Sequence, residues 1–381
     1  MTTTRIALPQ RSALFFVALL LTVAVTVLAQ GATSQENPAK ESSAKIRAEI
    51  ARLGQSLKDN PFNNPDFPKL DDNINALLQA SQGALDSGRT WSSLETLSRA
   101  MDLLNGARTV QAKGETVKSG LQAFETEWGK ASVALTALDE QARRRDWSHM
   151  PAAARALAEA AQGKAIPLMD GGRGFAYATK PGDGLFYMGQ AQGEEAFAAF
   201  LFALKMPTPA APLQLRSYLP ELQRLQDKTN AEFQPPKSID LHDRFIALNS
   251  TLKLAQELDS SRAYAGALYE YLEAMRHFAM LSAAVPEAGK LAQLKTTLAE
   301  EQTRLSASKR DDSIAQIFID RAQGWLAHPD GSASSSDELR SVQIVVEQVL
   351  PAYYAALKPA APVQRASAKT VNLTLVRWPY T

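Results

Sequence analysis

The amino-acid sequence predicts an all-α protein of about twelve helices in antiparallel hairpins, arranged as two tandem six-helix units. Apolar residues recur at spacings of three and four along most of the chain, which is the period of an amphipathic helix. Clusters of glycine, proline and asparagine interrupt this pattern and mark the connections. Two distant segments also match, ALKMPTPAAPLQ at 203–214 and ALKPAAPVQ at 356–364. The match suggests an internal duplication, folded as a solenoid-like stack or as paired bundles.

Residues 1–29 have the features of a secretory signal peptide. Two arginines precede an apolar run at 13–28, and Val27 and Ala29 supply the small residues of a cleavage site. The run is shorter than the ~20 apolar residues of a spanning helix, which favours cleavage over an uncleaved membrane anchor. Residues 30–40 are polar and would form a tether. The mature protein is therefore expected in the periplasm or outside the cell.

The composition excludes several kinds of function. The 381 residues include no cysteine, which rules out disulfides and thiolate metal sites. The 41 Lys and Arg balance the 40 Asp and Glu, so the chain lacks the basic excess that nucleic acids and anionic lipids attract. After the signal, no segment is apolar enough to span a membrane. We predict no cofactor, no nucleic-acid partner and no membrane span in the mature chain.

The first six-helix unit is assigned to residues 41–206. Asp71 or Asp72 would cap its second helix, and Ser92 with Glu95 would form a capping box for the third. The fourth helix has the clearest apolar stripe and ends in three arginines, which suit the negative end of a helix dipole. The apolar positions of these four helices are Ile46, Ile50, Leu53 and Leu57; Ile74, Leu77, Leu78 and Leu85; Leu94, Leu97, Met101 and Leu104; and Val117, Leu121, Phe124, Trp128, Ala131, Leu135 and Leu138.

A glycine-rich loop is predicted at 169–184, between a fifth helix at about 151–162 and a sixth at about 186–205. Five glycines within this segment favour irregular backbone. The loop could bring backbone N–H groups close to an anion, with added charge from Arg173 and Lys180. A mobile connection without a ligand is the alternative. The candidate ligand-binding residues are Arg173, Phe175, Tyr177, Lys180 and Tyr187.

A linker at 207–216 leads to the second unit, assigned to 217–358. Its landmarks follow the order of the first unit, since Asp86–Trp91 matches Asp259–Tyr264 and an Ala-Met pair follows in the next helix of both. The other expectations for this unit are a long helix opened by Pro286, a capping box at Ser335 and Glu338, and final helices at about 313–327 and 337–357.

Residues 359–381 would form a Pro- and Ala-containing linker and a strand-like tail. The segment 371–378 is rich in β-branched residues with a period of two, which is typical of a strand. A single strand needs a partner, which could be 174–179 of the same chain, a groove, or the sheet edge of another protein. The candidate partner-binding residues are Leu373, Leu375, Arg377 and Trp378.

The sequence offers no constellation that identifies an enzyme. Its four histidines lie outside any HExxH motif, and no phosphate-binding loop or GxSxG elbow occurs. Glu270, Glu273 and His277 share one helix face, as metal ligands can, but the polar face of an ordinary amphipathic helix has the same spacing. We therefore predict no catalytic and no metal-binding residues.

The predicted function is an exported, non-enzymatic scaffold that binds an envelope or extracellular protein through a helical face or the tail. The alternative is a small-ligand or polysaccharide-binding protein, or a helical lyase or hydrolase, with a pocket near 171–184. A bound small ligand would raise the thermal stability of the protein, whereas the scaffold requires a protein partner.

Overall fold

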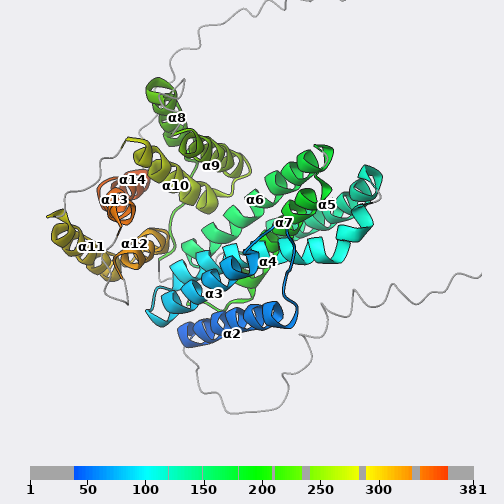
Figure 1. Ribbon diagram of the computed structural model, residues 1–381. Coiled ribbons are helices and arrows are strands. Elements are labelled where there is room, and N and C mark those ends of the chain that lie inside the picture. Colours follow the sequence, from blue (N-terminus) through cyan, green and yellow to red (C-terminus); the bar gives the residue numbers. More distant parts are fainter. Residues whose placement is uncertain are drawn as a thin grey trace, which may run out of the picture. The chain divides into compact units, whose positions relative to one another are not determined.

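A computed structural model describes residues 38–118, 120–147, 149–178, 180–207, 211–233, 241–282, 289–327 and 335–358. Every regular element in these ranges is a helix, which confirms the all-α prediction (Figure 1). With α13, η2 and α14 counted as one continuous helix, twelve helices lie in the described ranges, all within one compact unit that begins at Pro38. The bounds are α2 Pro38–Asp59, α3 Leu70–Asp86, α4 Thr90–Val117, α5 Leu121–Arg143, α6 Ala152–Tyr177, α7 Pro181–Ala203, α8 Leu219–Phe233, α9 His242–Ser260, α10 Tyr264–Ser282, α11 Lys290–Ala307, α12 Ser313–Leu326, α13 Ser336–Ile344, η2 Val345–Val349 and α14 Leu350–Ala356.

The hairpins α3–α4 and α9–α10 turn in the same way. In each hairpin a left-handed residue lies two positions after the end of the first helix, Gly88 with φ of 76° and Arg262 with φ of 67°. In both hairpins the next backbone N–H donates to the carbonyl five residues back, at 2.9 Å. This Schellman-type turn satisfies carbonyls that a helix end leaves free, and each hairpin closes in three residues.

The prediction of a glycine-rich loop at 169–184 is wrong. α6 continues to Tyr177 and α7 begins at Pro181, so most of this segment is helical. Its glycines serve helix packing, because a Cβ on Gly172 would lie 2.7 Å from the Gly184 carbonyl oxygen, and one on Gly184 would lie 2.6 Å from that of Gly172. Small residues let two helix backbones approach where any side chain would keep them apart. The fifth helix is therefore longer than the predicted 151–162.

Glycine also sets the packing of α7 on α4, which lie side by side in Figure 1. A Cβ on Gly189 would lie 2.5 Å from the Asn105 carbonyl oxygen, and one on Gly193 would lie 2.7 Å from Asp102 Cα. These positions are four residues apart and share one face of α7. α7 therefore lies close against both α4 and α6, with buried Leu185, Phe197 and Leu201 among its core residues.

Several helix starts differ from the sequence predictions. α4 begins at Thr90, before the predicted capping box, because a carboxylate from α12 caps its first turn. The N-cap of α3 is Lys69, and the two aspartates proposed as caps lie in the first turn instead. Gly120, with φ of 123°, separates α4 from α5 inside the stripe predicted as one helix.

The capping box that opens α13 is confirmed. The Ser335 hydroxyl accepts the Glu338 N–H at 3.2 Å, and the Glu338 carboxylate accepts the Ser335 N–H at 2.6 Å. The box depends on residues three apart in sequence, so local pattern is enough to find it.

Other predictions fall outside the described residues. These are the signal at 1–29, most of the tether at 30–40, Pro286, and the tail at 359–381 with the proposed strand. Among the helices that are described, none has the length and apolar character needed to cross a membrane.

Gly189→Ala is expected to destabilise the protein by about 1–3 kcal/mol, because the new methyl group meets the α4 backbone and forces the helices apart. Gly171→Ala is the matched control: its Cβ would meet nothing within 4 Å, so the higher helix propensity of Ala should leave stability equal or raise it by up to about 1 kcal/mol. Thermal unfolding followed by circular dichroism compares the two. Equal effects of both substitutions would contradict close α4–α7 packing.

Candidate functional site: a buried ionic network between α4, α10 and α12

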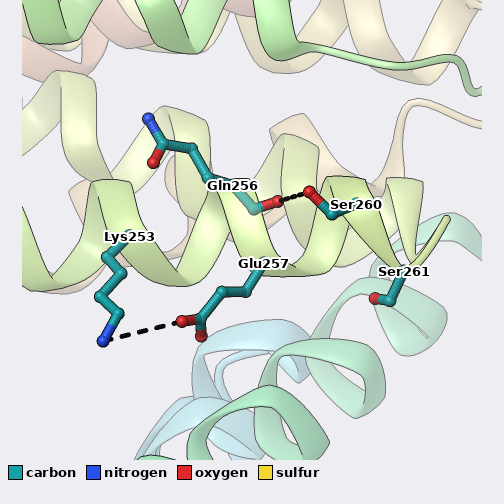
Figure 2. A pocket seen from close by; sticks show the side chains of 5 residues that line it. All are labelled: Lys253, Gln256, Glu257, Ser260 and Ser261. Carbon is teal, nitrogen blue, oxygen red and sulfur yellow. Dashed lines mark hydrogen bonds and ion pairs between the residues drawn. The ribbon is translucent and has the colours of Figure 1, made fainter. Parts of the chain in front are cut away.

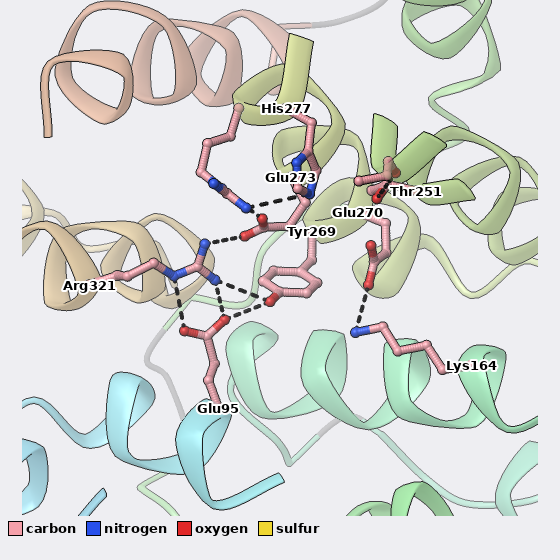
Figure 3. A network of polar contacts seen from close by, with 10 residues as sticks. Glu95, Lys164, Thr251, Tyr269, Glu270, Glu273, His277 and Arg321 are labelled. Carbon is pink, nitrogen blue, oxygen red and sulfur yellow. Dashed lines mark hydrogen bonds and ion pairs between the residues drawn. The ribbon is translucent and has the colours of Figure 1, made fainter. Parts of the chain in front are cut away.

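Arg321 of α12 lies at the centre of a buried ionic network (Figure 3). Its Nη1 donates to Glu273 Oε1 of α10 at 2.5 Å, and its Nη2 and Nε donate to the carboxylate of Glu95 on α4. The three side chains are only 12%, 9% and 9% exposed. One guanidinium therefore connects three helices, using the planar set of donors that lysine lacks.

Further side chains complete the hydrogen bonding around Arg321. The Tyr269 hydroxyl donates to Glu95 Oε1 at 2.6 Å, and Arg276 Nε donates to Glu273 Oε2 at 3.0 Å. His277 Nε2 lies 3.4 Å from the Arg276 guanidinium (Figure 3). Each carboxylate thus has more than one donor, as buried charges require.

The pair formed by Arg321 and Glu273 is charged at neutral pH. Burial alone would raise the pKa of Glu273, but attraction to Arg321 and Arg276 outweighs it and holds that pKa below its usual range. Burial would lower the pKa of Arg321, yet Glu273 and Glu95 raise it well above its usual value. Burial and then the charge of Arg276 lower the pKa of His277 to about 4, so this imidazole is neutral.

A second buried cluster lies beside the network and has different protonation. Lys164 of α6 lies 3.2 Å from Glu270 of α10, whose side chain is 4% exposed (Figure 3). Burial raises the pKa of Glu270, and it raises the pKa of Glu194 on α7 to about 7 against the attraction of Lys164. Burial and the charge of Glu194 raise the pKa of Asp102 well above its usual value. The carboxyl pair of Asp102 and Glu194 therefore keeps a proton near neutral pH.

Two buried carboxylates cap helices that lie far away in sequence. Asp320 of α12 accepts the Trp91 N–H at the start of α4 at 3.1 Å. Glu159 of α6 accepts the Gly266 N–H at the start of α10 at 2.8 Å. Free N–H groups of a first turn carry partial positive charge, so a carboxylate there both bonds and neutralises them. In the same manner, Asp311 caps α6 and Asp259 caps the start of α8.

Four of the ligand-binding residues predicted from sequence lie on α6 and α7, and Lys180 is the N-cap of α7. The structure places them in separate contacts. The Arg173 guanidinium donates to Glu125 at 2.9 and 3.1 Å and lies 4.6 Å from the Trp128 ring centre and 5.7 Å from that of Tyr177. The remaining three form two separate contacts: Phe175 stacks on Tyr187 at 4.8 Å, and Lys180 pairs with Asp183 at 3.9 Å. The partner-binding set Leu373, Leu375, Arg377 and Trp378 lies outside the described residues.

The trio Glu270, Glu273 and His277 occupies one face of α10, as its spacing predicts, but this face is buried and not solvated. Both carboxylates are engaged by cations from α6 and α12. In the described ranges, no group of three or more His, Asp or Glu side chains is placed to hold a metal ion. Sequence periodicity missed Lys164 and Arg321 as their partners, because those residues come from helices that only the tertiary fold brings together.

The protein surface also has depressions. One of about 510 Å³ lies along α9, where Lys253, Gln256 and Glu257 line it together with two serines (Figure 2). Lys253 and Glu257 pair at 3.7 Å, and their side chains are 75% and 51% exposed. Such a solvated pair contributes little energy and offers no desolvated group for chemistry.

Comparison with known proteins gives no match, whether to a protein family, to a curated sequence or to a solved structure. The function of this protein must therefore be inferred from the geometry of its side chains. The geometry combines neutralised ion pairs, cross-helix caps and a protonated carboxyl pair, all of which hold helices in place. These are the features of a rigid helical junction.

Arg321→Met is expected to destabilise the protein by about 3–5 kcal/mol, because it leaves Glu95 and Glu273 buried without their main cation. Arg52→Met is the control, since Arg52 is 63% exposed and pairs with Glu49 on its own helix; it should change stability by less than about 1 kcal/mol. Chemical denaturation measures both. A loss below 1 kcal/mol for Arg321→Met would contradict a network under strong desolvation.

The raised pKa of Glu194 gives a pH dependence with a definite sign. The folded state binds this proton more tightly than the unfolded state, so the stabilisation is complete below pH ~4.5 and is lost as pH rises through about 7. Glu194 faces Asp102 from α4, Lys164 from α6 and Glu270 from α10. Glu194→Gln should therefore reduce the fall in melting temperature between pH 5 and 8.

The control for this experiment is Glu115→Gln, which removes a carboxylate whose side chain is 85% exposed. Its melting curve should parallel that of the wild type at every pH. The assignment to Glu194 would be refuted by an unchanged pH profile in Glu194→Gln.

Proposed function

We propose that this protein is an exported, non-enzymatic helical scaffold, built from two copies of one helical unit, that binds another envelope or extracellular protein. The observation that carries the proposal is the reciprocal capping: α12 caps α4, and α6 caps α10. If α2–α7 and α8–α14 are the two copies, each copy completes the same hairpin of the other.

The residues around the two caps support the duplication. Glu159 is followed by Ala-Ala-Gln-Gly and Asp320 by Arg-Ala-Gln-Gly. A donor four residues earlier holds each carboxylate at 2.7 Å, Arg155 for Glu159 and Gln316 for Asp320. Each motif's final glycine lies against the opposite hairpin, where a Cβ would meet side chains at 2.5–2.8 Å. A shared sequence, a shared position and a shared role are more than helical composition alone would produce.

The hairpin turns also support the duplication. Gly88 and Arg262 have the same left-handed role, and the offset between them is the one that relates Ala100-Met101 to Ala274-Met275. The sequence match of Asp86–Trp91 with Asp259–Tyr264 sets Gly88 opposite Ser261, one residue from this offset. Helix capping geometry favours Gly88 opposite Arg262, because only one residue in each turn has a positive φ.

The scaffold role follows from where the charged groups are used. In the ionic network they join α4, α10 and α12, and in the cluster beside it Lys164 joins α6 to α10. The interior is therefore a fixed junction, and outer helix faces are held in constant positions. The small-ligand alternative relied on a glycine-rich loop, and helices occupy those residues. A rigid frame suits binding because little conformational entropy is lost when a partner docks.

Deleting residues 371–378 tests the contribution of the tail. Mature protein (residues 30–381) is purified after mild cross-linking of the envelope of the cells that make it, with and without this segment. A partner bound through the tail should be recovered at least about tenfold less from the truncated protein, because a strand supplies both backbone bonds and side-chain anchors. Equal recovery would eliminate the tail as the contact, and no enriched protein in either sample would reject the scaffold proposal.

A further inference from the structure

A groove of about 320 Å³ lies between α8, α10 and the final helix α13–η2–α14. Its floor is apolar, with Leu225 and Phe278 each 4% exposed and Ala356 2% exposed. The residues that line it are Glu221, Arg224, Leu225, Lys228, Tyr271, Met275, Phe278, Gln348, Ala355 and Ala356.

The lining residues follow helical spacing on both walls. On α10, Tyr271, Met275 and Phe278 are at positions i, i+4 and i+7, which is one face of a helix. On α8, the four lining residues from Glu221 to Lys228 are at i, i+3, i+4 and i+7. Two helical stripes with an apolar floor match the kind of surface that a third amphipathic helix covers. Tyr, Met, Phe and Arg are also the side chains enriched in protein interfaces.

The charged rim favours an acidic occupant. Glu221 is already neutralised, since Arg216 lies 2.7 Å away and Arg224 lies 3.5 Å away. Arg224 and Lys228 extend from the α8 wall with side chains 74% and 59% exposed. Lys228 lies 4.7 Å from the Phe278 ring centre and 3.9 Å from Glu232. The lining residues thus carry one net positive charge beside an apolar floor.

We propose that this groove binds an amphipathic helix of a partner protein, whose apolar face is flanked by acidic residues. The proposal rests on the proposed scaffold function and names its contact surface. The chain's own residues 359–381 contain three basic residues and no acidic residue, so charge disfavours them as the occupant. A second copy of the chain is the other possible occupant that the experiments below distinguish.

The first experiment measures peptide binding to the full mature chain by fluorescence anisotropy. Two 18-residue peptides share one pattern of leucines at helical spacing and differ only in having Glu or Lys at the flanking positions. The Glu peptide should bind about tenfold more tightly than the Lys peptide, and 300 mM NaCl should reduce this difference. Arg224→Glu/Lys228→Glu should reverse the preference. These side chains are exposed, so the variant is expected to fold.

Lys253→Glu is the matched control, because Lys253 of α9 (Figure 2) has a side chain 75% exposed and is not among the residues that line the groove. It should leave both affinities unchanged. Equal binding of the two peptides, or a preference that Lys253→Glu alters as much as the groove variant does, would overturn the proposal.

The second experiment places a photo-cross-linking amino acid at Met275 or at Leu373 in the full chain in its own cell envelope. A cross-link from position 275 to an acidic amphipathic segment of another protein, identified by mass spectrometry, supports the groove. A cross-link from 275 to residues 359–381 or to a second copy overturns it. Partner cross-links from position 373 alone reject the groove and keep the scaffold function, and no cross-link from either position rejects both.

Discussion

Carboxylate side chains that cap the first turn of a distant helix constrain how this chain can pack. The first turn of a helix has N–H groups without partners, and burying them without an acceptor is costly. α4 and α10 both begin where another helix covers them, and Asp320 and Glu159 supply the acceptors. These caps join residues 229 and 107 apart in sequence. Neither hairpin can therefore complete its hydrogen bonding until the distant helix is in place, which links segments that lie far apart in sequence.

The Arg321 network also determines the position of α12 along α4 and α10. Removing a guanidinium and two carboxylates from water is expensive, and an apolar replacement of the whole set could be as stable. Apolar side chains, however, tolerate sliding of one helix on another. Arg321 satisfies its donors only where Glu95 and Glu273 both face it, so α12 has one position against α4 and α10. The close α4–α7 and α6–α7 approaches at glycine restrict the other helices in the same way.

A scaffold interpretation unites these features. The ionic and capping groups bond to one another inside the protein, whereas the α8–α10 groove presents aromatic, methionine and basic side chains at its surface. If the two halves are copies, the first half need not have an equivalent groove, because α8 and α10 carry side chains that their counterparts α2 and α4 lack. Duplication would supply the frame, and divergence of surface residues would supply the specificity.

The sequence by itself determined those structural features that depend on residues within one helical turn of each other. Apolar spacing identified an all-helical chain, and the box at Ser335 was found because its two bonds join residues three apart. The tertiary structure decided the roles of glycine and of buried charge. Gly172 and Gly184 resemble loop residues until α7 lies on α6, and Glu273 resembles a solvated residue until Arg321 arrives from α12. Local propensity records how a residue acts in its own helix, whereas close packing and charge neutralisation depend on which distant helix lies opposite.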